Sequence, residues 1–178
     1  MLLNEIGEVD DVLEAHATEL GKDLTAYRNH VYRVVNLAAA LSGSDPERLP
    51  KMALAAAFHD LGIWTDGTFD YLRPSMRLAS AHLARSGRAE WTPEIAEMIL
   101  EHHKISPYRG DAHGLVEPFR RADLVDVSRG LITFGLPRRL LREIFSRWPS
   151  AGFHWRLVQL ALARLRTHPW SPLPMLKL

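Results

Sequence analysis

The sequence predicts an all-helical fold, and three observations lead to this prediction. Apolar residues recur at helical spacing along most of the chain, whereas the alternation typical of strands is almost absent. Clusters of Gly, Pro and Ser, such as the run at 42–46, divide the chain into segments of helix length. No internal repeat or low-complexity linker separates these segments. Because 178 residues suffice to bury one core, we expect a single domain over 1–178.

The first three helices follow from their apolar spacing and their terminal residues. Two are expected over about 4–20 and about 24–41. A third helix should begin at Pro46 behind an Asp45 cap, because Asp favours the N-cap and Pro favours the first helical position. It carries the stretch KMALAAAFHD and should end near Gly62.

The remainder of the chain predicts five more helices and two loops. The helices are expected over about 74–86, 92–103, 115–129, 137–147 and 153–167. The loops are expected at 62–73 and 105–114, where Gly, Asp and Pro gather. The tail from residue 168 holds three of the eleven prolines and should therefore be extended.

Composition limits the classes of protein to be considered. The chain has no cysteine, which excludes disulfides, thiolate ligands and cysteine nucleophiles. Its first residues carry acids where a signal peptide needs basic and apolar runs. No apolar stretch approaches the ~20 residues of a membrane span. We therefore expect a cytoplasmic protein with no membrane partner, and a homo-oligomer is compatible with this composition.

The net charge of +1 hides an uneven distribution. From Arg120 onward there are eleven Lys or Arg residues and only three Asp or Glu residues. Such a basic half attracts a phosphorylated substrate or nucleic acid, or it presents a solvated helix face that includes Arg138 and Arg142. We favour the solvated face and expect no nucleic-acid binding, because no recognition motif is present.

Five of the nine histidines and two aspartates lie where a metal site would need them. His30 shares a helix face with Val34 and Leu37, and Asp123 also lies on a largely apolar face, so both should point inward. Any one of these residues alone would be interpreted as a hydrogen-bonded core residue. Together they predict a metal site, because a divalent ion offsets the cost of burying carboxylates and imidazoles. The candidate ligands are His30, His59, Asp60, His82, His102, His103 and Asp123.

The nature of these ligands restricts the metal. Imidazoles and carboxylates without thiolates suit iron, manganese, zinc, cobalt or nickel, as one or two divalent ions. The other four histidines have no place in the pattern and are interpreted as ordinary surface or core residues.

The order of these residues over successive helices resembles the HD superfamily of metal-dependent phosphohydrolases. The resemblance covers about residues 24–129, and its most specific piece is FHDLG after an alanine-rich helix, with RADLVDVSRG closing the set. It implies an HD-type helical bundle, followed by C-terminal helices and a Pro-rich tail over 130–178. It implies a first metal held by His30, His59, Asp60 and Asp123.

The resemblance further implies a second metal. His82 and His102 would hold it, with Asp60 as the bridging ligand. His103 could replace or join His102, and His102 is favoured because it keeps the usual spacing after the apolar run that precedes it.

The resemblance implies a metal-dependent hydrolase that acts on a small phosphoester or a nucleotide through a metal-activated water. Asp60, Lys104 and Arg28 are the candidate catalytic residues, with Arg109 as a further candidate for charge stabilisation. Many HD phosphohydrolases carry a phosphate-contacting lysine three residues after the aspartate, but this chain has Ile63 there.

Two other chemistries of the same superfamily stay open. One is a dinuclear iron oxygenase that oxidises a small molecule, and the other is a mononuclear hydratase resembling cyanamide hydratase. The aromatic residues Trp64, Phe69 and Tyr71 in the first loop form the wall of a pocket above the metal or pack that loop onto the core. Because the same ligands serve all three chemistries, the sequence selects neither the substrate nor the metal.

Overall fold

The computed structural model describes residues 2–43, 45, 47–110, 114–171 and 173–176. Within these residues the chain is helical and contains no strand, so the predicted all-α class is confirmed. None of the helices in these ranges has both the length and the apolar character needed to cross a bilayer. The α-helices are α1 Gly7–Ala15, α2 Ala17–Leu20, α3 Leu24–Ser42, α4 Leu49–Phe58, α5 Gly62–Thr65, α6 Leu72–Arg85, α7 Thr92–Glu101, α8 Val116–Val127, α9 Arg138–Arg147 and α10 Phe153–Thr167.

Several predicted boundaries differ from the structure: the third predicted helix already ends at Phe58, and the predicted loop 62–73 contains α5 and the start of α6. The first predicted helix is broken at His16, which separates α1 from α2. The third begins at Leu49, and its proline in the first turn is Pro50. Asp45 does not cap this helix, because its carboxylate instead accepts a hydrogen bond from the backbone N–H of Glu47. Pro46 lies outside the described residues.

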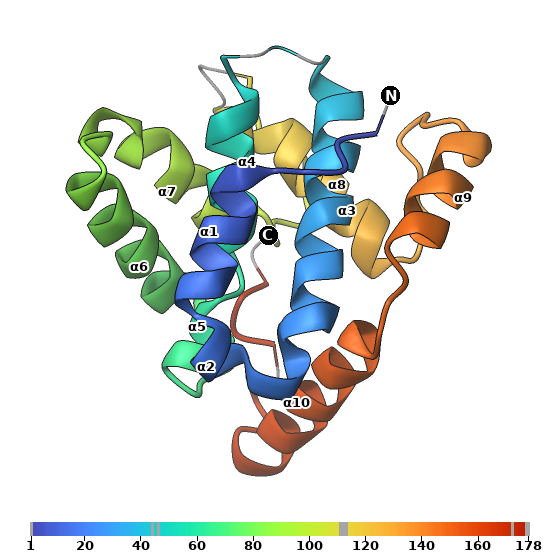
Figure 1. Ribbon diagram of the computed structural model, residues 1–178. Coiled ribbons are helices and arrows are strands. Elements are labelled where there is room, and N and C mark those ends of the chain that lie inside the picture. Colours follow the sequence, from blue (N-terminus) through green and yellow to red (C-terminus); the bar gives the residue numbers. More distant parts are fainter. Residues whose placement is uncertain (1, 44, 46, 111–113, 172, 177–178) are drawn as a thin grey trace.

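The long helix α3 occupies the middle of the molecule and packs against both α4 and α8 (Figure 1). The helices α6 and α7 form a pair on one side, and α9 and α10 lie on the other. The last turns of α4 contain three consecutive alanines, Ala55, Ala56 and Ala57, which are completely buried. Small side chains allow helices to approach one another closely, so the end of α4 lies near both α3 and α7.

The C-terminal half covers the core from outside. Helix α9 buries Leu141 and Ile144 and exposes Arg138 and Arg142, as expected for a solvated basic face. The tail after α10 returns toward the middle of the molecule (Figure 1). There Met175 is buried in a small apolar cluster that also contains residues of the loop between α5 and α6.

Gly62 lies where α5 and α6 meet too closely for a side chain. A Cβ atom at Gly62 would lie 2.7 Å from the carbonyl oxygen of Tyr71 and 2.8 Å from the Cβ of Pro74. The Gly62 N–H donates a hydrogen bond of 2.9 Å to Ser75 Oγ. The glycine of the FHDLG stretch thus serves packing, and it fixes the turn that follows His59.

We expect Gly62→Ala to destabilise the protein by about 1–3 kcal/mol, because the added methyl group meets backbone atoms that have little room to move. Urea denaturation followed by circular dichroism measures the change. Gly7→Ala is the matched control, because a Cβ there meets nothing within 4 Å, and it should leave the stability unchanged or slightly higher. Equal stabilities of the two variants would contradict this account of Gly62.

Candidate metal centre

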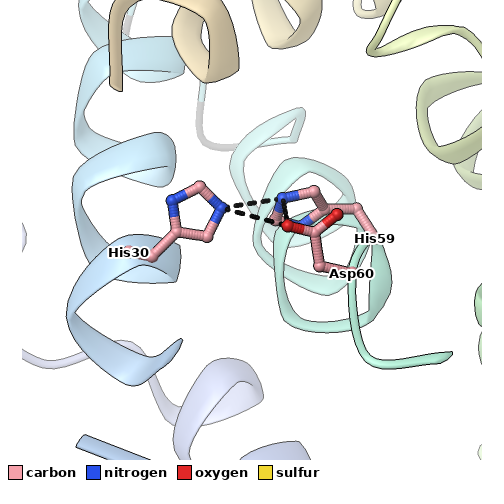
Figure 2. A group of neighbouring side chains, drawn as sticks. All are labelled: His30, His59 and Asp60. Atoms are coloured by element: carbon pink, nitrogen blue, oxygen red, sulfur yellow. Dashed lines mark hydrogen bonds and ion pairs between the residues drawn. The ribbon is translucent and has the colours of Figure 1, made fainter. Parts of the chain in front are cut away.

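Four buried side chains from three helical segments surround one point. His30 comes from the middle of α3, His59 and Asp60 follow the last turn of α4, and Asp123 comes from α8. Figure 2 shows the imidazole of His30 directed at His59 and Asp60. None of these four residues is more than 3% exposed.

The distances between the facing atoms suit a shared metal ion. The two Nε2 atoms of His30 and His59 are 2.9 Å apart. Each lies between 3.4 and 3.7 Å from Asp60 Oδ2 and from Asp123 Oδ1. Ligand atoms bound at ~2.1 Å around one ion lie roughly 3.0–3.5 Å from one another. His30, His59 and Asp60 form a group that could hold a single ion after small shifts of these side chains, and Asp123 Oδ1 lies beside the two imidazoles.

Hydrogen bonds fix the tautomers of three imidazoles. The Nδ1 of His30 lies 2.7 Å from Asp126 Oδ2. The Nδ1 atoms of His59 and His102 each lie 2.7 Å from the backbone carbonyl three residues earlier. Because a carbonyl or carboxylate oxygen only accepts, each Nδ1 carries the proton, and the lone pair of Nε2 is directed to the centre. Metal-binding histidines are held in the same way.

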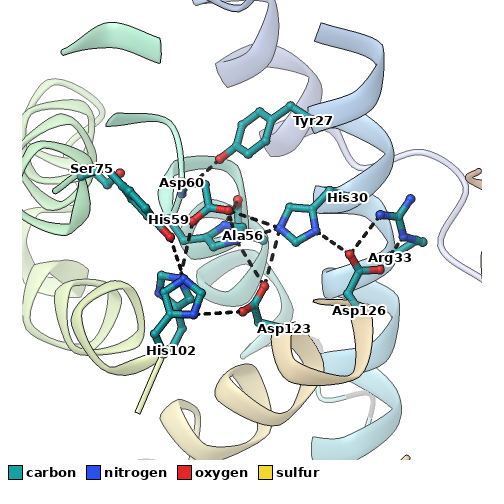
Figure 3. Close-up of polar contacts among 12 residues, drawn as sticks. Tyr27, His30, Arg33, Ala56, His59, Asp60, Ser75, His102, Asp123 and Asp126 are labelled. Atoms are coloured by element: carbon teal, nitrogen blue, oxygen red, sulfur yellow. Dashed lines mark hydrogen bonds and ion pairs between the residues drawn. The ribbon is translucent and has the colours of Figure 1, made fainter. Parts of the chain in front are cut away.

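Three buried atoms of this group have no hydrogen-bond partner in the described structure: Asp60 Oδ1, Asp123 Oδ1 and His102 Nε2. Unpaired buried acceptors cost free energy, and in native proteins they indicate a missing partner. All three can donate a lone pair, and all of them face the same region (Figure 3). The residues therefore fit a bound divalent cation.

A second group adjoins the first and shares Asp60 with it. His102 Nε2 lies 3.5 Å from Asp60 Oδ1, while the other oxygen of Asp60 faces the first group. His103 Nδ1 lies 3.7 Å from Asp123 Oδ2, and its Nε2 is 2.6 Å from the hydroxyl of Tyr71. His30, His59 and Asp60 could hold one ion, and Asp60, His102 and His103 could hold another.

His82 takes no part in either group, contrary to the ligand set implied by the sequence. Its ring packs against the ring of Phe58 with the ring centres 5.3 Å apart, and burial, followed by the charges of Arg88 and Arg85, lowers its pKa. Successive residues of a helix point about 100° apart. A side chain that packs on Phe58 is therefore turned away from His59. His103 joins His102 in the second group, which is one of the two roles that the sequence left open for it.

The three candidate catalytic residues have different surroundings. Asp60 lies at the centre, between the two groups. Lys104 lines a cavity together with His102 and His103. Arg28 does not reach the centre, because its guanidinium pairs with Asp10 at 2.9 Å, and Arg109 is exposed in a loop. The side chain of Arg28 points elsewhere because it lies only two positions before His30 on the same helix.

Asp126 is a buried residue of the site that sequence reasoning missed. It is completely buried and accepts hydrogen bonds from His30 and from both Nε and Nη2 of Arg33 (Figure 3). Arg33 is also completely buried and donates a hydrogen bond to the carbonyl of Trp148. On the other side, His154 donates to the backbone carbonyl of Asp126 at 2.9 Å. In the sequence, the three-residue spacings from His30 to Arg33 and from Asp123 to Asp126 could have indicated this role, because residues at this spacing share a helix face.

The carboxylates set the protonation of the first group. Burial lowers the pKa of His59, but the charges of Asp60 and Asp123 outweigh it and raise this pKa to about 9. Burial likewise raises the pKa of Asp60, but His59 and His102 hold it well below its usual range. Without a metal, the Nε2 of His59 therefore also carries a proton at neutral pH.

His103 and Tyr71 form a neutral pair beside the second group. Burial, followed by the charge of His102, lowers the pKa of His103 to about 3. Burial, followed by the charge of Asp60, raises the pKa of Tyr71 well above its ordinary value. Near neutral pH the pair therefore consists of an imidazole and a phenol that share one hydrogen bond.

A cavity of about 610 Å³ opens beside the second group. His102, His103 and Asp123 contribute polar atoms to its lining, and Phe69 and Tyr71 form part of the wall. Of the aromatic residues in the first predicted loop, these two line the cavity. Trp64 instead packs the loop onto the core, where its Nε1 donates to Asp23 at 3.0 Å and its ring contacts Tyr27. Both proposed roles of this loop are therefore present.

Comparisons with models of protein families, with curated proteins and with solved structures find no match for this chain. The resemblance to the HD superfamily thus stays a prediction from the sequence. The chemistry of the protein is inferred below from the geometry of the two ligand groups and of the cavity.

We expect Asp126→Asn to weaken metal binding about 10- to 100-fold, because His30 loses the carboxylate that orients its ring and increases its basicity. Competition with a coloured chelator measures the affinity. Glu117→Gln is the matched control, since Glu117 also pairs with a buried arginine, Arg120, but does not contact the ligands. Both variants should lose stability, and only Asp126→Asn should lose metal affinity. An equal loss of affinity in both would assign Asp126 a structural role alone.

We expect metal binding to release about one proton from His59 at pH 7–8, because its pKa of about 9 keeps it protonated in the metal-free protein. As the pH is raised toward 9, the affinity for the metal should consequently rise about tenfold for each pH unit, and above pH 9 it should level off. Calorimetric titration with Mn²⁺ in two buffers of different ionisation enthalpy counts the released protons. A heat that does not depend on the buffer would contradict this assignment.

Proposed function

We propose that this protein is a metal-dependent hydrolase that acts on a small phosphomonoester. One observation supports the proposal above the others. Three imidazoles whose Nδ1 atoms are hydrogen-bonded turn their Nε2 atoms toward the same region as the unpaired oxygens of Asp60 and Asp123, and this group lies at the wall of a cavity large enough for a substrate.

The ligands would hold an ion next to the cavity. The ion would be held by His30, His59, Asp60 and Asp123, and it would supply an acidified water together with polarisation of a phosphoryl oxygen. Asp126 orients the ring of His30 and thereby the position of its lone pair. His103 lines the cavity, and its hydrogen bond with Tyr71 fixes the orientation of its ring.

The phosphate would be neutralised by Lys104. Ile63 stands at the position of the phosphate-contacting lysine of many HD phosphohydrolases, and it is buried in the apolar cluster around Tyr71 and Met175. Lys104 is the only cationic side chain among the described residues that line the cavity. Its ammonium group would stabilise the charge that develops on the phosphoryl oxygens.

A second candidate is a dinuclear iron oxygenase that oxidises a small molecule. It is supported by the second ligand group of Asp60, His102 and His103, which could hold an additional ion beside the first. The two oxygens of Asp60 face the two groups separately. The two candidates differ in the metal they require and in their need for oxygen.

We expect protein purified without chelator to contain one or two divalent ions and to hydrolyse 4-nitrophenyl phosphate. His59→Ala and Asp60→Asn should each abolish metal uptake and reduce hydrolysis to the background rate, because each removes a ligand of the first group. His82→Ala is the matched control, since His82 lies outside both groups, and it should retain metal and activity. Circular dichroism confirms that each variant is folded.

Elemental analysis combined with iron electron paramagnetic resonance separates the two candidates. Manganese, zinc or cobalt with hydrolysis in the absence of oxygen supports the hydrolase. A coupled iron pair with oxygen-dependent turnover would favour the oxygenase. Metal content that survives both His59→Ala and Asp60→Asn would show that the site lies elsewhere, and no metal uptake on titration would refute both candidates.

A further inference from the structure

The cavity beside the metal centre has a mainly apolar wall. Apart from Lys104, its polar lining consists of His102, His103 and Asp123 from the candidate centre and the hydroxyl of Tyr71, which is bonded to His103. The other lining residues are aliphatic or aromatic. The volume of about 610 Å³ falls within the roughly 300–1,000 Å³ of ordinary small-molecule sites.

Apolar side chains at the opening of this cavity are exposed to water. Six of its lining residues have exposed fractions from 38% to 59%. They come from the loop after α7, from α8 and the loop behind it, from α10 and from the tail. A concentration of exposed apolar surface around one opening is typical of a binding site for an apolar ligand. The six residues are Ile105, Val127, Ile132, Val158, Leu173 and Leu176.

The charge in the cavity is confined to the end that contains the metal centre. Lys104 follows His103 directly in the chain, and no second Lys or Arg is present among the described lining residues. A nucleotide carries several phosphate charges or many hydrogen-bonding groups, and burying these without partners is costly. A single charged head group at the end that contains the metal centre and an apolar body along the remaining wall would match the distribution of charge in the described lining.

We propose that the cavity binds a substrate with one anionic head group at the metal centre and an alkyl or aryl body along the wall, and that it discriminates against nucleotides. This substrate class rests on the proposed function for the chemistry of the head group. Binding of the apolar body depends only on the cavity. Part of the wall is formed by α10 and the tail, beyond the segment 24–129 that carries the ligands.

A series of n-alkylphosphonates tests the proposal, because phosphonates keep the head group constant and are not cleaved as esters. Calorimetry on the Mn²⁺-loaded full chain would compare n-butyl-, n-hexyl- and n-octylphosphonate with AMP. We expect up to about fourfold tighter binding for each added methylene that is buried, and weaker binding of AMP than of n-octylphosphonate. An affinity independent of chain length, or tighter binding of AMP, would overturn the proposal.

Two variants on α10 locate the binding of the alkyl chain. Val158 lines the cavity and Leu162, one turn further on, does not, although their exposed fractions of 44% and 50% are similar. Val158→Gln should weaken binding of n-octylphosphonate about fivefold, whereas Leu162→Gln should leave it unchanged. Because both side chains are exposed, both variants should fold. An equal effect of the two substitutions would place the alkyl chain outside this cavity.

The same measurements separate failure of this proposal from failure of the proposed function. Dependence of the affinity on chain length in a protein that hydrolyses no phosphoester would support the apolar cavity and refute the hydrolase. Hydrolysis of 4-nitrophenyl phosphate without any dependence on chain length would support the hydrolase and refute the apolar cavity.

Discussion

The fold depends on one buried network of charged groups that joins α3 to α8. Asp126 accepts hydrogen bonds from His30 and Arg33, and Arg33 continues to the carbonyl of Trp148 at the end of α9. Breaking such a buried pair is costly because the remaining charge has no water to solvate it. This network therefore fixes three helices relative to one another. The network also fixes the tautomer of His30. The same hydrogen bonds therefore stabilise the core and orient a ligand of the candidate site.

The same region contains more negative than positive charge. Three buried carboxylates lie around His30, with Asp60 and Asp123 near its Nε2 and Asp126 at its Nδ1, and only Arg33 among their described contacts carries a permanent positive charge. Extra positive charge must come from protons on the imidazoles or from a bound cation. The raised pKa of His59 shows that a proton can supply this charge, and a divalent ion would supply it instead of the proton. A bound metal would therefore displace a proton from this buried position.

Helical periodicity was sufficient to predict the helices and the inward direction of His30 and Asp123, because a side chain on an apolar face must be buried wherever that helix packs. Helical periodicity could not predict the surroundings of His82, because tertiary contacts decide which helix α6 packs against. The role of Asp126 required knowing that α3 and α8 are neighbours. The aromatic loop residues Phe69 and Tyr71 could be predicted as part of the cavity wall, whereas the part of the wall that α10 and the tail contribute is distant in sequence from the ligands, so no local pattern could predict it.

The position of Asp60 has a consequence for how the two ligand groups would fill. One carboxylate presents Oδ2 to the first group and Oδ1 to the second, so the two binding equilibria would be thermodynamically linked. An ion at one group would withdraw charge from the shared carboxylate and repel a second ion, and by reciprocity the second would weaken the first equally. Loading would then be sequential, with a half-filled form at limiting metal. The supply of metal, and not only its identity, would set the state of the centre.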